Sequence, residues 1–319
     1  MKLQFVVSNQ TNPYLNIAVE NYLVECSEAV TMYLWRNHRT VVIGQNQNPF
    51  SEVNLEALEA DGGYLMRRRT GGGAVYHDDG NLNFSFVVPK ALYDQSRQFR
   101  VIQRAVADFG IVAELSGRND ILTGGRKFSG NAFSKGRRND LHHGTILIRG
   151  NMADLQRYLK PKPAKLLKHG VSSVQSRVVN LADLNPDITP ESIAPRLRAA
   201  FEMEYSGCSE VVDYSALVCK PEVQALCSEF ASDEWLYGRW RTFTAQRSGH
   251  FEWGEVELQL VVDGGIIRDV QIASDALNLA ALDEARRLLV GVDTGKTLVT
   301  DDRSPIVRDI INLAFSERG

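Results

Sequence analysis

The chain has 319 residues, of which 44% are hydrophobic and 24% are charged. This length suffices for one large domain and a smaller one, and the composition is that of a folded globular protein. The net charge of −3 argues against nucleic-acid binding. No apolar run approaches the ~18 residues of a membrane span, and the N-terminal apolar stretch is too short for a signal peptide. We therefore expect a cytoplasmic protein with no membrane contact.

The first 160 residues carry a mixture of strand-like and helix-like patterns. Asn12 is expected to cap the first helix, and Ser51 a short one that ends at Gly62. In chain order the patterns predict a strand at 3–7, a helix over 13–25, strands at 32–35, 40–43, 64–66, 74–76 and 82–88, a helix over 99–109, a strand at 145–148 and a helix over 153–159. Because strands cluster with helices between them, without strict βαβ alternation, the expected fold class is α+β with mixed sheets and flanking helices.

The second half of the chain contains a predicted break after Trp240. Before it, the Lys- and Pro-rich stretch 160–177 lacks periodicity and is interpreted as a mobile or partner-facing loop, with a solvated charged face as the alternative for its lysine run. From His250 the pattern predicts a hairpin with its turn at 263–265, followed by helices over 278–290 and 305–315. We therefore predict two domains, a large one over 1–240 and a small ββαα unit over 248–319.

The strongest chemical signal is RRRTGGGAVYHD, from Arg67 to Asp78. Three consecutive glycines cost backbone entropy, and they let backbone N–H groups approach an anion or a ligand carbonyl. The preceding arginines add cationic groups suited to phosphate or carboxylate. A Gly-rich hairpin turn beside a solvated charge run is the structural alternative, but the combination favours a binding site.

A second signal lies in SGRND, ending at Asp120, and in GGRKFSGNA, which contains Lys127. A lysine held between glycines can neutralise an α-phosphate and a carboxylate together. Asp120 is a hard oxygen ligand that could meet Mg²⁺ bound to a nucleotide, although a turn-forming Asn-Asp is an equal alternative. In LHHGTILI, His142 and His143 point to opposite faces of a strand, so at most one of them faces a pocket.

Together, RRRTGGGAVYHD, RKFSGNA, HHGT and the upstream VVIGQNQNP resemble the motif set of lipoate–protein ligases of the ligase A type. The resemblance runs along nearly the whole chain, and it implies a biotin/lipoyl-ligase-like catalytic domain. It also implies the roles of individual residues: Lys127 would contact both lipoate and nucleotide; ATP would bind at Arg68, Gly73, Ala74, Val75 and Tyr76; lipoate would bind at Gly71, Gly72 and His77. Thr70 stands where Ser is usual, and Asn131 where a small hydroxyl residue is common.

The resemblance implies a two-step reaction that uses ATP and Mg²⁺. Lipoate would be activated to lipoyl-AMP, and the lipoyl group would then pass to a lysine of a carrier protein. The implied carriers are the lipoyl domains of 2-oxoacid dehydrogenase acyltransferase subunits and the glycine cleavage H protein. The sequence leaves open which carrier is used and whether lipoate or octanoate is preferred.

Two other functions remain open. An octanoyl or lipoyl transferase works without ATP through a cysteine thioester, and this chain has no cysteine between Arg67 and Thr145. A non-catalytic carrier-binding homologue would keep the fold, but retention of Lys127 and the glycines argues against it. A biotin ligase would be expected to show a GRGR-like loop, which the chain lacks.

Overall fold

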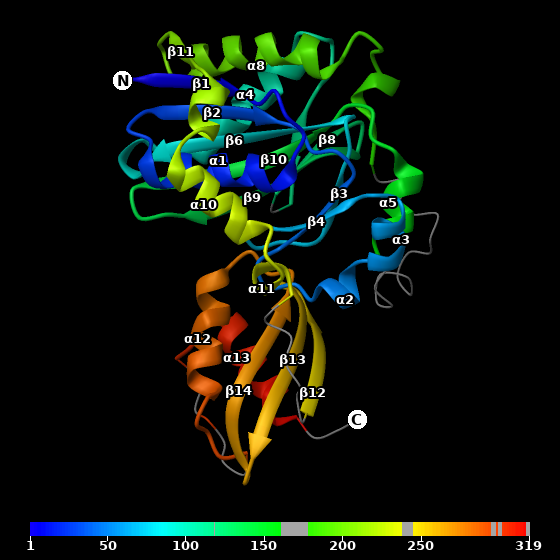
Figure 1. Cartoon of the computed structure of the whole chain (residues 1–319), viewed down its shortest axis with the longest axis vertical. Coiled ribbons are helices and arrows are strands. Elements are labelled where there is room, and N and C mark those ends of the chain that lie inside the picture. The colour runs from blue at the N-terminus through cyan, green and yellow to red at the C-terminus, as the bar shows by residue number, and fades with distance from the viewer. Residues whose placement is uncertain (118, 161–177, 238–244, 295–297, 299–301, 317–319) are drawn as a thin grey trace. The chain divides into compact units, whose positions relative to one another are not determined.

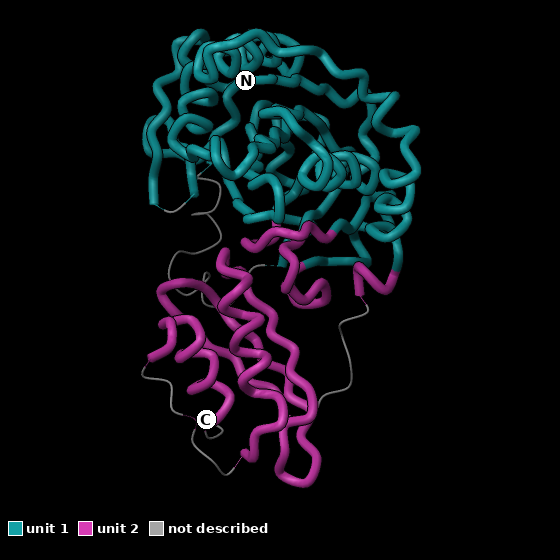
Figure 2. Tube along the Cα trace, turned by 90° about the vertical axis from the view of Figure 1, so that its left-hand side faces the viewer, with its two compact units in different colours: residues 1–42, 53–66, 75–232 teal, residues 43–52, 67–74, 233–319 magenta. Residues whose placement is uncertain are grey.

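The computed structural model describes residues 1–117, 119–160, 178–237, 245–294, 298 and 302–316. The chain forms two compact units, coloured separately in Figure 2. The first comprises Met1–Val42, Val53–Met66 and Val75–Ser232, and the second Ile43–Glu52, Arg67–Ala74 and Asp233–Gly319. Residue 240 and the lysine-rich stretch from 161 to 177 lie outside the described residues. The domain boundary and the partner-facing loop therefore stay predictions.

The first unit is built on an eight-stranded mixed sheet (Figure 1). In spatial order its strands are β11 (Ser209–Val212), β1 (Leu3–Val7), β2 (Val30–Trp35), β6 (Asn81–Pro89), β10 (Asn139–Leu147), β9 (Arg126–Lys135), β8 (Asp120–Thr123) and β7 (Glu114–Ser116). β1 runs parallel to both of its neighbours, and the other neighbouring pairs are antiparallel. The strands predicted at 3–7, 32–35 and 82–88 are confirmed, and the one predicted at 145–148 is the end of β10.

The two faces of this sheet differ in chemistry because side chains alternate along each strand. Phe84 and Phe86 of β6 enter the main hydrophobic core, which α4 (Gln95–Ala107) and α8 (Pro190–Glu204) share with the sheet. Between them, Ser85 points to the opposite face, where it meets α1 (Pro13–Cys26). This second face is buried but carries polar side chains, and it positions the candidate site.

The helix starts follow from side-chain capping. Asn12 Oδ1 accepts from the first backbone N–H groups of α1, as predicted. The prediction that Ser51 caps a helix is wrong, because Ser51 lies inside α2 (Pro49–Glu52) and Asn54 caps α3 (Leu55–Ala60). Among the described residues, the remaining helical segments of the first unit are α5 (Met152–Tyr158), α9 (Tyr214–Val218), α10 (Pro221–Phe230), and the short η1 (Lys90–Leu92) and η2 (Leu181–Asp183).

A second, three-stranded sheet places β3 (Thr40–Ile43) between β4 (Tyr64–Arg67) and β5 (Val75–His77). These strands match the predicted runs to within one residue. β5 pairs antiparallel with β3, which brings the end of the glycine motif onto a regular strand.

The C-terminal part of the second unit is a three-stranded antiparallel sheet with two helices. Its elements are α11 (Asp233–Leu236), β12 (Ala245–Phe251), β13 (Gly254–Asp263), β14 (Ile266–Ser274), α12 (Leu279–Leu289) and α13 (Pro305–Phe315). The predicted hairpin and both helices are confirmed, but the ββαα description is wrong because β12 precedes them. β12 escaped prediction because AQRSGHF contains few apolar residues, and three of its seven positions are exposed.

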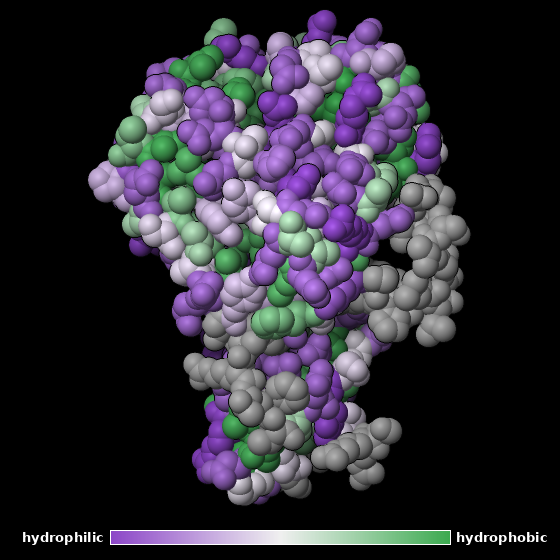
Figure 3. Space-filling view, turned by 45° about the vertical axis from the view of Figure 1, so that its right-hand side comes forward, coloured by the Kyte–Doolittle hydropathy of each residue, from purple (hydrophilic) through white to green (hydrophobic). Residues whose placement is uncertain are grey.

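The expected α+β class is confirmed by these mixed sheets and their helices. No helix within the described ranges is long and apolar enough to cross a membrane. Where Figure 3 draws described residues, hydrophobic side chains lie in small groups between hydrophilic ones.

Candidate active site

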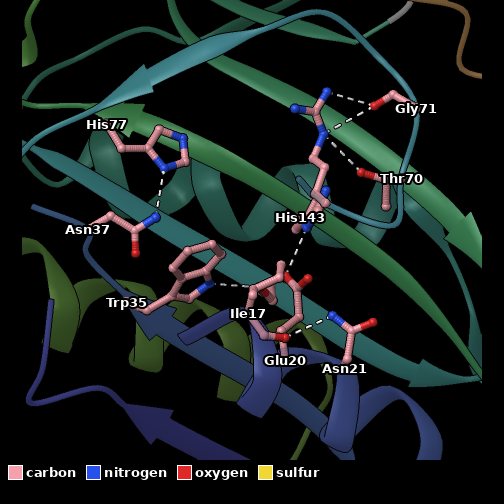
Figure 4. Close-up of polar contacts among 11 residues, drawn as sticks. Ile17, Glu20, Asn21, Trp35, Asn37, Thr70, Gly71, His77 and His143 are labelled. Atoms are coloured by element: carbon pink, nitrogen blue, oxygen red, sulfur yellow. Dashed lines mark hydrogen bonds and ion pairs between the residues drawn. The ribbon is translucent and has the colours of Figure 1, made fainter. Parts of the chain in front are cut away.

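A chain of buried polar side chains crosses the face of the large sheet that meets α1 (Figure 4). Trp35 Nε1 donates to Ser85 Oγ over 3.0 Å, and Ser85 donates to Glu20 Oε1 over 2.5 Å. His143 Nδ1 lies 2.8 Å from the same carboxylate oxygen. Glu20 is only 1% exposed. Because a buried carboxylate is tolerated only when it is paired and hydrogen-bonded, these groups hold one another in fixed positions.

The two adjacent histidines lie on opposite faces of β10, as predicted. His143 faces Glu20, whereas His142 faces the aromatic core beside Phe84 and Phe86. Neither Glu20 nor its partner Ser85 belongs to a motif that is recognisable in the sequence. The only local signal was that Glu20 is one of the few polar residues among the buried positions of α1.

His77 ends β5 and is oriented by a relay that begins on α1. Asn16 Nδ2 donates to Asn37 Oδ1 over 3.2 Å, which turns Asn37 Nδ2 toward His77 Nδ1 at 3.3 Å. Nδ1 is therefore the acceptor, and the neutral ring carries its proton on Nε2. The relay gives His77 a defined N–H donor.

Tyr76 points away from His77, to the other side of β5. Its hydroxyl lies 3.4 Å from Asp154 Oδ2, and its ring lies 5.3 Å from the ring of Tyr158 on α5. Burial raises the pKa of Tyr76 far above its ordinary value, with the Asp154 carboxylate adding to the rise. The Tyr76 side chain is thus packed on α5, while the preceding Val75 is half-buried.

Lys127 lies near the start of β9, opposite β8. Regular alternation would place Lys127 and Gly130 on opposite faces, since three residues separate them. The β8–β9 ladder shifts its register between Ile121 and Leu122, and this bulge returns Lys127 to the face of Gly130. A Cβ added to Gly130 would lie 2.9 Å from Lys127 Nζ. The ammonium also lies 2.7 Å from Asp120 Oδ1, so the structure brings these two predicted residues together.

The Lys127 ammonium shares a sheet face with the buried polar chain. The Gly130 N–H donates to Thr145 Oγ1 over 3.2 Å. Thr145 and His143 are two residues apart on β10 and therefore point to the same face. One face thus carries, from the interior outward, Glu20, His143, Thr145 and the cation.

Asp120 is the residue predicted to meet a metal. Its side chain is 36% exposed, and it lines a surface cavity of about 270 Å³. Within the described part of the chain, no group of three or more His, Cys, Asp or Glu residues could hold a metal ion. A single carboxylate fits Mg²⁺ only when further oxygen ligands come with the substrate, as is usual for Mg²⁺ carried by phosphates.

In the second unit, Arg67 is a structural residue and not the phosphate contact suggested by the arginine run. It is 1% exposed, and its guanidinium donates to five backbone carbonyls. These belong to Gly44, Gln45, Gln47, Trp235 and Leu236, at 2.6–3.3 Å. Arg67 therefore joins three separate stretches of the chain.

Arg68 shapes the glycine loop from inside. Its Nη2 donates over 2.8 Å to the carbonyls of both Gly71 and Gly73. Gly72 has a φ of +96°, which favours glycine, and a Cβ on Gly71 would lie 2.3 Å from Ala276 O. Two of the three glycines are thus required by the loop and by its contact with the end of β14, independently of any ligand. At Gly73 a Cβ would meet open space.

Comparison with known proteins gives a match over the region that contains these motifs. The family model for the lipoyl protein ligase A/B catalytic domain matches residues 12–202, more than half of the chain. The chain belongs to the lipoyl protein ligase family. A second model, for the bacterial lipoate protein ligase C-terminus, matches residues 241–302 of this lipoyl protein ligase family member.

Relatives of this lipoyl protein ligase family member span nearly its whole length. A lipoate-protein ligase A of Psychrobacter cryohalolentis is 40% identical over 305 residues, covering 93% of this chain and 90% of the relative. That of Bdellovibrio bacteriovorus is 38% identical over 299 residues, covering 91% and 88%. The crystal structure of P. falciparum LipL1 in complex with lipoate is 30% identical, with a TM-score of 0.85 over 99% of this chain and all of that one. The resemblance inferred from the motifs is confirmed.

Proposed function

We propose that this protein is an ATP-dependent lipoate–protein ligase, which makes lipoyl-AMP and transfers the lipoyl group to a carrier lysine. The observation that carries the proposal is the Lys127 ammonium, returned by a β-bulge to the sheet face that holds Glu20 and His143. A cation at one end of a buried, preorganised face suits a ligand with an anionic head and a long tail. The relatives named lipoate-protein ligase A support the same reaction.

The proposed ligand contacts follow the motifs. Lipoate would bind through Lys127, Gly71, Gly72 and the His77 N–H donor. ATP would bind at Lys127 and at a second set of residues. That set comprises Arg68, Gly73, Ala74, Val75 and Tyr76. Since the Tyr76 side chain packs on α5 and the Arg68 guanidinium holds loop carbonyls, we assign Tyr76 a backbone contact and Arg68 a role through the loop it shapes.

In the first step a lipoate carboxylate oxygen attacks the α-phosphorus of ATP, and the bond to pyrophosphate breaks. Negative charge accumulates on the phosphorus oxygens in the transition state, where the Lys127 ammonium would stabilise it. In the second step the neutral amine of a carrier lysine attacks the acyl carbon, AMP leaves, and the amine loses its proton. Asp120 holds the ammonium in place at 2.7 Å.

Mg²⁺ is proposed to accompany the nucleotide, where it supplies charge neutralisation to the phosphates. Asp120 is the described residue that we assign to it, as one oxygen ligand beside those of the nucleotide.

The proposed carriers are the lipoyl domains of 2-oxoacid dehydrogenase acyltransferase subunits and the glycine cleavage H protein. The lysine-rich stretch 160–177 would face them, because its positive charge would attract an acidic carrier. The proposed location is the cytoplasm, which rests on the sequence alone.

The test is to incubate the protein with ATP, Mg²⁺, lipoate and an apo lipoyl domain, and to weigh the acceptor. We expect one added lipoyl group per domain, dependent on ATP. Lipoate-dependent exchange of pyrophosphate into ATP reports the first step alone. Acyl transfer between carriers without ATP would instead indicate a transferase. Carrier binding with neither reaction would indicate a non-catalytic homologue.

A further inference from the structure

Asn131 of β9 is joined to Asn119 by three hydrogen bonds. The backbone N–H and Nδ2 of Asn131 both donate to Asn119 O over 2.9 Å, and Asn119 Nδ2 donates to Asn131 O over 2.7 Å. Asn119 directly precedes Asp120, whose carboxylate holds Lys127 Nζ. The side chain at position 131 thus helps to fix the point at which the chain enters β8. A small hydroxyl residue at 131 would keep the two bonds made by its backbone N–H and carbonyl. It would lose the Nδ2 bond to Asn119 O and the Oδ1 contact with His142.

The orientation of the Asn131 carboxamide is fixed from both sides. Its Nδ2 is directed at Asn119 O and at Ser129 Oγ, 3.3 Å away. Its Oδ1 therefore faces His142 Nε2, at 2.9 Å. A carboxamide oxygen can only accept, so Nε2 of His142 must carry the ring proton.

His142 is itself enclosed by aromatic side chains. The ring is fully buried, and four aromatic rings lie 4.7–5.7 Å from it, those of Phe84, Phe86, Phe99 and Phe133. Its Nδ1 lies 2.8 Å from Oε1 of Gln98 on α4. A neutral ring that donates from Nε2 accepts at Nδ1, so this tautomer requires the Gln98 carboxamide to be turned with its NH₂ group toward the ring. Gly144 leaves room for the arrangement, because a Cβ there would lie 2.6 Å from Asn131 Oδ1.

We propose that Asn131, held by His142, is a positioning residue for adenylation that acts through Asn119 and Asp120 on Lys127. The inference rests on the proposed function. On the described contacts, Asn131 and His142 lie on the core side of the sheet, opposite the Lys127 face. They act by keeping the Asp120–Lys127 pair at the position where the Lys127 ammonium can contact the α-phosphate. A displacement of about 1 Å in such a group costs roughly 100-fold in rate.

The experiment compares Asn131→Ser with Phe133→Leu in lipoate-dependent ATP–pyrophosphate exchange. Phe133→Leu disturbs packing around His142 without touching the hydrogen bonds, so it controls for a purely structural effect. We expect Asn131→Ser to lower kcat by ~10- to 100-fold, with KM for ATP and lipoate within about twofold of the parent value, and Phe133→Leu to leave kcat within about twofold. Equal effects of the two variants, or an unchanged kcat in Asn131→Ser, would overturn the proposal.

A double-mutant cycle with Asp120→Asn tests the route of the effect. If Asn131 acts through Asp120, the double variant loses little more than the worse single variant. Fold losses that multiply would show that Asn131 acts independently, and the proposal would fail. If Asn131→Ser does not fold, Asn119→Ala replaces it in the same cycle. The Asn119 side chain is half-buried, and its removal abolishes the hydrogen bond from Asn119 Nδ2 to Asn131 O. If the parent protein has no exchange activity, the proposed function is refuted. If the parent is active and the variants are unaffected, only the positioning role of Asn131 is refuted.

Discussion

The burial of His142 predicts that the free energy of unfolding decreases in mild acid, and that a defined part of this decrease is caused by the His142 ring alone. Burial lowers the pKa of His142 well below its ordinary value of 6.5, with neighbouring His143 as a smaller cause. As the pH falls below 6.5, the unfolded chain takes up a proton on this ring and the folded protein does not. The stabilising contribution is therefore complete above pH 6.5 and is lost as the pH falls toward the folded pKa.

Its size follows from linkage. Each pH unit below 6.5 removes ~1.4 kcal/mol while the folded ring stays neutral, so lowering the pH from 7.5 to 5.0 should remove about 2 kcal/mol. Hydrogen exchange of the β6 and β10 amides measures the free energy of unfolding of the first unit at both pH values. In His142→Gln the pH-dependent loss should be about 2 kcal/mol smaller, because all other titratable groups are shared. The same pH dependence in both proteins would show that the folded ring is protonated, and the assigned tautomer would be wrong.

Four further predictions concern the site and the second unit. Lys127→Met should fold normally and lower the rate of pyrophosphate exchange by ~100- to 1,000-fold; a rate near that of the parent would remove the ammonium from the chemistry. Gly71→Ala forces a Cβ against Ala276 O and should lower the thermal midpoint measured by calorimetry, whereas an unchanged midpoint would mean that this contact is absent in solution. Arg67→Met leaves five carbonyls without their donor and should cost about 3–5 kcal/mol in hydrogen exchange of β13, with a loss below about 1 kcal/mol contradicting its structural role. A chain ending at Tyr237 should lose adenylate synthesis but still acylate the carrier from preformed lipoyl-AMP; assays of both half-reactions decide, and full-rate synthesis would refute it.

Much of the fold could be predicted because its signals are local. The alternation of β6 and the Gly264–Gly265 turn lie within single short stretches of sequence. The elements that were missed have weak local patterns. β9 contains RKFSGNAFSK, and its bulge interrupts the alternation that would have indicated a strand.

The residues of the candidate site also differ in whether a local sequence signal identifies them. The glycine motif, Lys127 and Asp120 could be singled out because each lies in a contiguous motif, but the pairing of Lys127 with Asp120 was not predicted. Glu20 could not, because its partners Ser85 and His143 are 65 and 123 residues away, and only the strand order of the large sheet brings them together. Three adjacent arginines look alike in a sequence. Arg67 differs from the other two because its guanidinium donates to backbone carbonyls that are distant in the chain.

The contact between Gly71 and Ala276 has a consequence for synthesis on the ribosome. These residues are about 205 positions apart in the chain, yet the loop packs directly on the later one. At the usual ~5–20 residues per second, roughly 10–40 s pass between their appearance. During that interval the nascent large sheet can form, but the glycine loop has no surface to rest on. A ribosome-bound chain that stops before β14 should therefore hold its glycine loop without the contact to Ala276, and should make no lipoyl-AMP, however well its first unit has folded.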